Sequence, residues 1–90
     1  MASTDAPKNA ALTEIHEFLD VTADRCPMTF VRTRLRLDRM AAGQVLEVRF
    51  AGREPAENLP RSARDLGHAV LALEMDESVE PRGRVVLRKA

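Results

Sequence analysis

The sequence has little sulfur, few aromatic rings and no excess of either charge. Its 90 residues include one cysteine, no tryptophan, no tyrosine and three phenylalanines, with 14 basic and 14 acidic residues. A single cysteine excludes an internal disulfide and any metal site with two or more cysteine ligands. Because nucleic acids are bound through aromatic stacking and positive charge, direct nucleic-acid binding is not expected.

Long apolar runs are also absent. No segment approaches the roughly 18 consecutive apolar residues of a membrane-spanning helix, so no membrane partner is expected. The first residues, MASTDAPKNAALTEI, lack the apolar core of a signal peptide. Since an exposed lone thiol is a hazard in an oxidising compartment, the expected location is the cytoplasm.

What the sequence does contain is a regular succession of short elements. Residues 1–13 are small and polar and are expected to form a flexible tail, whereas residues 14–90 are expected to form one domain. Apolar periodicity predicts strands over 15–21, 44–50, 68–75 and 84–89, and helices over 27–42 and 60–66. This β-α-β-α-β-β order predicts the α+β class, as a two-layer α/β sandwich with both helices on one face of a four-stranded mixed sheet.

Turn-forming residues set the expected boundaries of the helices. Gly43 is expected to end the first helix by adopting a positive φ. Residues 51–60 are expected to form a loop, with Asn58 capping the second helix and Gly67 ending it. The third strand is expected to be buried through three apolar side chains, Val70, Leu71 and Leu73.

The only cysteine lies at the expected start of the first helix. In the stretch LDVTADRCPMTFVRTRLRL, Cys26 is followed by Pro27, and proline is favoured in the first helical turn. That turn has unpaired backbone N–H groups and a partial positive charge, which favour a thiolate, and Arg25 and Arg32 would add to the effect. A thiolate is nucleophilic, but free cysteines are also often buried. A reactive thiol and a small core side chain therefore both remain open.

The same stretch resembles the signature of the TusA family of sulfur-carrier proteins (SirA-like), L-D-x-x-G-x-x-C-P-x-P followed by a helix, a glycine and a strand. Leu19-Asp20 and Cys26-Pro27 stand at the spacing of the motif. Ala23 replaces the motif glycine, and Thr29 replaces the second proline. The likeness covers residues 16–89 and continues through Gly43 with VLEV, Glu54-Pro55, Asn58-Leu59-Pro60 and Gly67-His68.

The resemblance implies that Cys26 is the catalytic residue of a sulfur relay, carrying a sulfane sulfur as a persulfide. No cofactor is implied, because the sulfur is held covalently. A cysteine desulfurase or another donor would load Cys26, and an acceptor protein would receive the sulfur for tRNA thiolation, molybdenum-cofactor maturation or oxidative sulfur metabolism. Four neighbouring residues are expected to support the thiol: Pro27, Arg25, Asp20 and Thr29.

Side chains of the first helix are candidates for binding a partner. Two of these side chains are arginines, Arg32 and Arg36, which also fit a solvated helix face. The other two are apolar and also fit packing at the edge of the core. His16 and His68 are expected to be structural, and neither has a second ligand at the spacing of a metal site, so no metal is expected. The partner-binding candidates are Arg32, Arg36, Val31 and Leu35.

Two other functions stay open at this point. The chain fits a non-catalytic interaction or regulatory module that uses its helix faces to bind a partner. It also fits a thiol redox protein, although it has no second cysteine to resolve an oxidised one. As an enzyme, it would act only as a sulfurtransferase within a relay.

Overall fold

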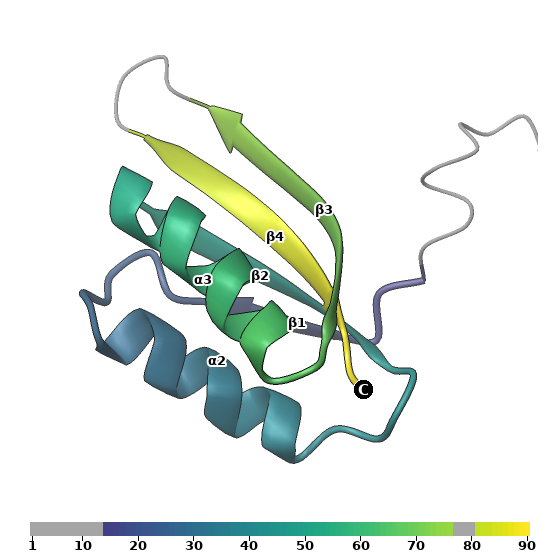
Figure 1. Ribbon diagram of the computed structural model, residues 1–90. Coiled ribbons are helices and arrows are strands. Elements are labelled where there is room, and N and C mark those ends of the chain that lie inside the picture. The colour runs from purple at the N-terminus through teal and green to yellow at the C-terminus, as the bar shows by residue number, and fades with distance from the viewer. Residues whose placement is uncertain (1–13, 77–80) are drawn as a thin grey trace, which may run out of the picture.

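A four-stranded mixed sheet with two helices on one face forms the fold, as the sequence predicts (Figure 1). The computed structural model describes residues 14–76 and 81–90, so the expected tail over residues 1–13 lies outside the described residues. The elements are β1 (Glu17–Asp20), α2 (Met28–Asp38), β2 (Val45–Ala51), α3 (Arg53–Asp65), β3 (Ala69–Asp76) and β4 (Arg82–Arg88).

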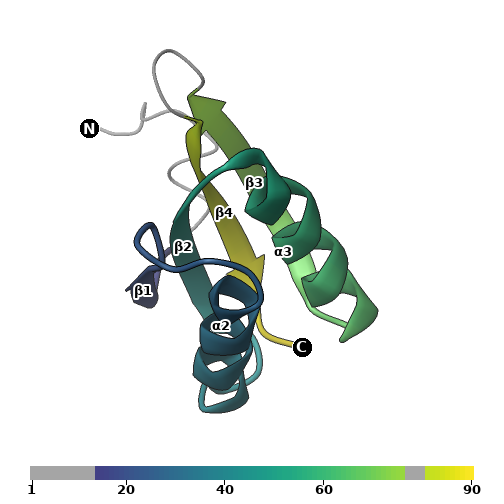
Figure 2. The same ribbon diagram turned by 90° about the vertical axis from the view of Figure 1, so that its left-hand side faces the viewer.

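The strands are arranged in the order β1-β2-β4-β3. β1 runs parallel to β2, whereas β2 and β3 each run antiparallel to β4. In Figure 2, α2 lies on the side of β1 and β2, and α3 lies on the side of β4 and β3. The two central strands, β2 and β4, therefore contribute most to the core, and β1 and β3 are edges.

Alternate residues of the central strands form the core. Leu46, Val48 and Phe50 of β2 are fully buried. They belong to one apolar cluster that also contains Leu37 of α2 and Leu59 of α3. The intervening residues of β2 point to the face of the sheet that carries no helix, because side chains alternate along a strand.

α2 is shorter than the sequence predicts, since it ends at Asp38 and not near Ala42. Where the predicted last turn is absent, Lys89 of the C-terminal segment contacts the end of the helix. Lys89 donates its Nζ to the Leu37 carbonyl at 2.8 Å, and its own carbonyl accepts the N–H of Gly43 at 2.9 Å. Gly43 has the expected positive φ, 89°, but in the turn that leads to β2 and not directly after the helix. Because last-turn carbonyls lack helical partners, the lysine satisfies one of them.

α3 begins seven residues earlier than predicted, at Arg53, so the expected loop is mostly helical. Gly52 precedes it with φ 103°, a conformation that glycine adopts without strain. Pro55 lies in the first turn, where its missing N–H has no helical partner to lose. Asn58 is therefore inside the helix and not its cap, and Pro60 is buried in the interior. The two prolines made this segment look like a loop in the sequence, but it forms a helix that packs against the sheet.

Gly67 ends α3, as predicted. It has φ 92°, and its N–H donates to the Arg64 carbonyl at 2.9 Å. The N–H of His68 donates to the Ala63 carbonyl at 3.0 Å. This pair of bonds is a Schellman motif, which requires a left-handed residue at the position of Gly67.

β3 is less buried than predicted. The register with β4 shifts between Val70 and Ala72, which indicates a β-bulge at Leu71. Leu71 and Leu73 are exposed, at 36% and 45%, so the prediction that they are buried is wrong. Val70 and Met75 pack against the core. An edge strand with a bulge has a partner on one side only, so its apolar side chains receive less cover.

Candidate functional site

Cys26 is exposed in the connection between β1 and α2, residues 21–27, which we call the Cys26 connection. Pro27 is the N-cap of α2, and the Cys26–Pro27 peptide bond is cis. The N–H of Met28 donates to the carbonyl of Arg25 at 2.6 Å, which closes the turn around the thiol. The structure thus places the sulfur at the start of the helix and in contact with solvent, and not in the core.

No described residue donates a hydrogen bond to the Cys26 sulfur. The helix therefore acts on the sulfur only through the partial positive charge of its N-terminus, which favours an anion. Arg25, the neighbouring residue, is exposed. An exposed sulfur with no hydrogen-bond donor among the described residues is accessible to an incoming group.

Asp20 shapes the turn at the beginning of the Cys26 connection. Its Oδ1 accepts hydrogen bonds from the Thr22 hydroxyl at 2.7 Å and from the Thr22 N–H at 2.8 Å. These two bonds lower the pKa of the Asp20 carboxyl below its ordinary value, because they favour the carboxylate. Asp20 therefore orders the backbone, as expected of an aspartate in a turn.

Thr29, which stands where the family motif has its second proline, points into the molecule. It is buried, at 3% exposure. Its carbonyl accepts a hydrogen bond from the Thr33 hydroxyl at 2.7 Å. Thr33 is also buried, one helical turn later. The residue at this motif position thus packs under α2, while the exposed surface near Cys26 is formed by other residues.

Arg32 and Arg36 are both engaged within the chain. The Arg32 guanidinium forms an ion pair with the Asp24 carboxylate in the Cys26 connection. Arg36 donates from its Nη1 to Glu17 Oε1 at 3.2 Å and to the Phe18 carbonyl at 3.3 Å. The structure therefore brings Arg32 to the Cys26 connection, but it gives both arginines structural partners.

The apolar candidates on α2, the helix that follows Cys26, are exposed. Val31 is 36% exposed and Leu35 is 59% exposed. Met28, which the sequence analysis did not single out, is 47% exposed. The spacing 28, 31, 35 places all three on one helix face, a signal that was readable from the sequence. We call these three residues the apolar row.

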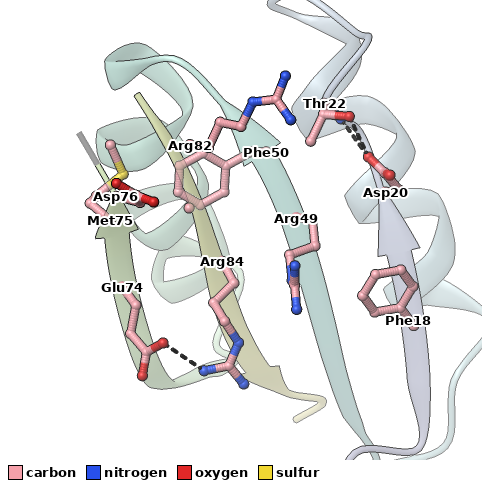
Figure 3. A pocket seen from close by; sticks show the side chains of 11 residues that line it. Phe18, Asp20, Thr22, Arg49, Phe50, Glu74, Met75, Asp76, Arg82 and Arg84 are labelled. Carbon is pink, nitrogen blue, oxygen red and sulfur yellow. Dashed lines mark hydrogen bonds and ion pairs between the residues drawn. The ribbon is translucent and has the colours of Figure 1, made fainter. Parts of the chain in front are cut away.

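A shallow pocket of about 500 Å³ lies on the face of the sheet that carries no helix (Figure 3). Arg49 lies over the Phe18 ring, with its guanidinium carbon 5.6 Å from the ring centre. Arg84 joins Glu74 to Glu47 through ion pairs of 3.1 and 3.3 Å. Cys26 does not line this pocket.

The ion pairs on this face are internal to the sheet. Burial raises the pKa of Glu47, but hydrogen bonds from Arg84 and Arg49 more than offset this and hold the pKa below its ordinary value. The hydrogen bond to Glu47 in turn raises the pKa of Arg84. These charged side chains thus form ion pairs with one another, and this arrangement does not indicate a binding site for an ion.

Both histidines accept backbone hydrogen bonds. His16 Nδ1 accepts the N–H of Val45 and His68 Nδ1 accepts the N–H of Ala90, each at 3.0 Å. Burial, with the nearby charge of Lys89, lowers the pKa of His68.

Within residues 14–76 and 81–90, no three His, Cys, Asp or Glu side chains are grouped so as to hold a metal ion. Neither described helix has the length and apolar character that a membrane crossing requires.

Comparison with a solved structure supports the fold. The chain resembles a SirA-like protein from Desulfitobacterium hafniense with a TM-score of 0.62 and 20% sequence identity. The match covers 78% of this chain and 95% of that protein. The agreement supports the two-layer α/β sandwich that the sequence predicts.

Comparisons of sequence identify the family. Relatives whose names begin "Putative sulfur carrier protein" are 42% identical over 62 residues in Archaeoglobus fulgidus and 37% identical over 71 residues in Methanocaldococcus jannaschii. These matches cover 68% and 79% of this chain, and 69% and 91% of the relatives. The family model described as "Sulfurtransferase TusA" matches residues 17–89. The chain therefore belongs to the TusA family of sulfur-carrier proteins.

Proposed function

We propose that Cys26 accepts a sulfane sulfur from a donor protein and passes it to an acceptor protein. The observation that carries the proposal is the position of Cys26, exposed at the start of α2 in a chain of this family. A cysteine desulfurase or a comparable persulfide enzyme is the proposed donor. The acceptor serves tRNA thiolation, molybdenum-cofactor maturation or sulfur oxidation, and the relay operates in the cytoplasm.

The chemistry needs no cofactor and no net oxidation. The Cys26 thiolate attacks the terminal sulfur of the donor persulfide, so a bond forms between the two sulfurs while the donor S–S bond breaks and the donor thiolate leaves. In the second step, an acceptor thiolate attacks the terminal sulfur on Cys26, and the Cys26 thiolate leaves. A solvent-exposed sulfur to which no described residue donates a hydrogen bond suits both steps.

The apolar row provides the proposed docking surface. Met28, Val31 and Leu35 lie on the helix that starts two residues after Cys26, so a partner seated on them has its own thiol near the sulfur. Exposed apolar side chains in a row mark an interaction surface more often than isolated ones do. Arg25, which is exposed beside Cys26, gives the docking surface a positive edge.

Intact mass spectrometry tests the proposal. After incubation with a cysteine desulfurase and cysteine, the wild type is expected to gain the mass of one sulfur, and reduction should remove it. The Cys26→Ala variant is expected to gain nothing. A wild-type protein that stays unmodified under conditions that load another sulfur carrier would refute the relay.

The apolar row also fits the alternative of a module that only binds a partner. In that case the Cys26→Ala variant keeps its partner and its biological activity, because the thiol has no part in the function. Cys26→Ala therefore separates the two functions. A Leu35→Asp substitution tests the docking surface itself, since it is expected to abolish partner binding in both cases, while iodoacetamide still alkylates Cys26.

A further inference from the structure

Beyond Val21, which is buried in the apolar core, the Cys26 connection has few contacts of its own that fix its position. Cys26 and three other residues of the connection are exposed: Ala23, Arg25 and Pro27. The N–H of Val21 donates to the Arg49 carbonyl of β2 at 2.8 Å, but the backbone bonds of the following residues are local, such as the one from the Asp24 N–H to the Val21 carbonyl at 3.0 Å. These short turns define the shape of the connection, but they do not anchor it to the side of α2.

Two arginines of α2 supply that anchor. Arg32 forms an ion pair with Asp24 in the connection, and Arg36 binds Glu17 and the Phe18 carbonyl in β1. Because the arginines are four residues apart, they lie on the same face of the helix. Their partners lie on either side of the turn at Asp20. The segment before Cys26 is therefore tied to α2 at both of its ends.

We propose that Asp24, Arg32, Arg36 and Glu17 form a clamp that positions the Cys26 connection for transfer of sulfur between proteins. The inference rests on the proposed function and deepens it, because it assigns Asp24 and Arg32 as positioning residues and not as contacts for a partner. A donor protein presents its persulfide from a fixed docked position, and transfer requires the two sulfurs to approach within about 3.5 Å. A small reagent approaches from any direction and has no such requirement.

The clamp can be separated from a simple effect of charge on the thiol. Asp24→Asn removes a negative charge and Arg32→Gln removes a positive charge, so their electrostatic effects on the Cys26 thiolate have opposite signs. Both substitutions break the same ion pair, so loss of the clamp has the same sign in both. A matched control is Arg34→Gln on the same helix, because Arg34 contacts Asp38 at 3.9 Å and not the Cys26 connection.

The first measurement is amide hydrogen exchange of residues 22–27, read by mass spectrometry. Exchange is expected to become about two- to five-fold faster in both variants, the range that an exposed ion pair supports. Added salt should speed exchange in the wild type but not in the variants, since it screens the same pair. The double substitution Asp24→Arg with Arg32→Asp is expected to restore slow exchange, and Arg34→Gln is expected to leave it unchanged.

The second measurement is loading by a cysteine desulfurase. The kcat for transfer from the desulfurase to Cys26 is expected to fall about two- to five-fold in both single variants, with the KM for the carrier unchanged, while the rate of alkylation by iodoacetamide shifts in opposite directions. Shifts of kcat in opposite directions, or a charge-reversed pair that fails to restore exchange, would overturn the clamp. A wild type that is not loaded at all would instead refute the relay, and the exchange measurement would still decide on the clamp.

Discussion

The centre of the sheet and the Cys26 connection are stabilised by different kinds of interaction. In β2 and β4, seven residue pairs are in register, and Val48, Phe50 and Val85 have no exposed surface. In the connection, the side chains are mostly exposed, and the contacts to α2 are hydrogen bonds and ion pairs. Burial of a large apolar side chain contributes about 1.5–3 kcal/mol, whereas an exposed ion pair contributes about 0.2–1 kcal/mol.

Because of this difference, the stability of the domain and the reactivity of the thiol are expected to depend on different residues. The buried residues that carry the stability of the domain lie in the strands and on the inner sides of the helices, and apart from Val21 no residue of the Cys26 connection belongs to the apolar cluster. A substitution in one region should therefore leave the property of the other region intact. The following predictions test that separation, from the centre outwards.

The largest expected effect is that of Phe50→Ala in β2. Phe50 is fully buried in the main apolar cluster, and its removal leaves a cavity between the sheet and the helices. The free energy of unfolding is expected to fall by about 3–5 kcal/mol. Urea unfolding followed by circular dichroism measures the change. A loss below about 1 kcal/mol would mean that the centre is not the main source of stability.

Gly83→Ala in β4 is expected to have the next largest effect. A Cβ at Gly83 would lie 2.4 Å from the Glu74 carbonyl oxygen and 2.8 Å from Phe50 Cζ. Because the nearest atom belongs to the backbone of β3, the strands must move apart, and we expect a loss of about 1–3 kcal/mol. The same urea experiment measures it. A neutral result would show that the β3 edge shifts freely against β4.

A smaller effect is expected from His68 as the pH falls. Burial and the charge of Lys89 lower the pKa of His68 below its ordinary value of 6.5, so the unfolded chain binds a proton before the folded one does. The contribution of His68 to stability is therefore complete above about pH 6.5 and decreases as the pH falls through that value.

The substitution His68→Asn tests this dependence. An asparagine oxygen can accept the Ala90 N–H in place of His68 Nδ1, and asparagine does not titrate. Urea unfolding between about pH 7 and pH 5.5 is expected to show a smaller loss of stability in the variant than in the wild type. Equal losses in the two proteins would exclude His68 as the source. Glu47, whose pKa is also lowered, affects stability at more acidic pH, below its ordinary value of 4.5.

The sequence was most informative where periodicity was strong. The alternation in Leu46, Val48 and Phe50 predicted β2 and its buried face, and Pro27 predicted the helix start beside Cys26, whose exposure only the structure shows. The start of α3 was missed because Pro55 and Pro60 are usually helix breakers, while tertiary packing decides this case. The burial of Leu71 and Leu73 was predicted wrongly, since hydrophobicity alone does not reveal an edge strand or a bulge.

Contacts between distant segments were the least predictable. Arg32 and Arg36 have the sequence pattern of a solvated helix face, and only the structure shows that they bind Asp24 and Glu17. Lys89 near the C-terminus ends α2, a contact across 52 positions of the chain. Such pairings depend on how the elements pack, so they could not be derived from local patterns.

The smallest expected effect on stability is that of Cys26→Ala. The thiol is exposed and no described residue donates a hydrogen bond to its sulfur, so the free energy of unfolding should stay within about 0.5 kcal/mol of the wild type. Urea unfolding of the variant beside Phe50→Ala gives the contrast directly: one variant loses stability and the other loses sulfur loading. A loss above about 1 kcal/mol for Cys26→Ala would mean that the thiol contributes to packing. The connection would then be part of the core, and its freedom to present a persulfide to different partners would be limited by the folding of the domain.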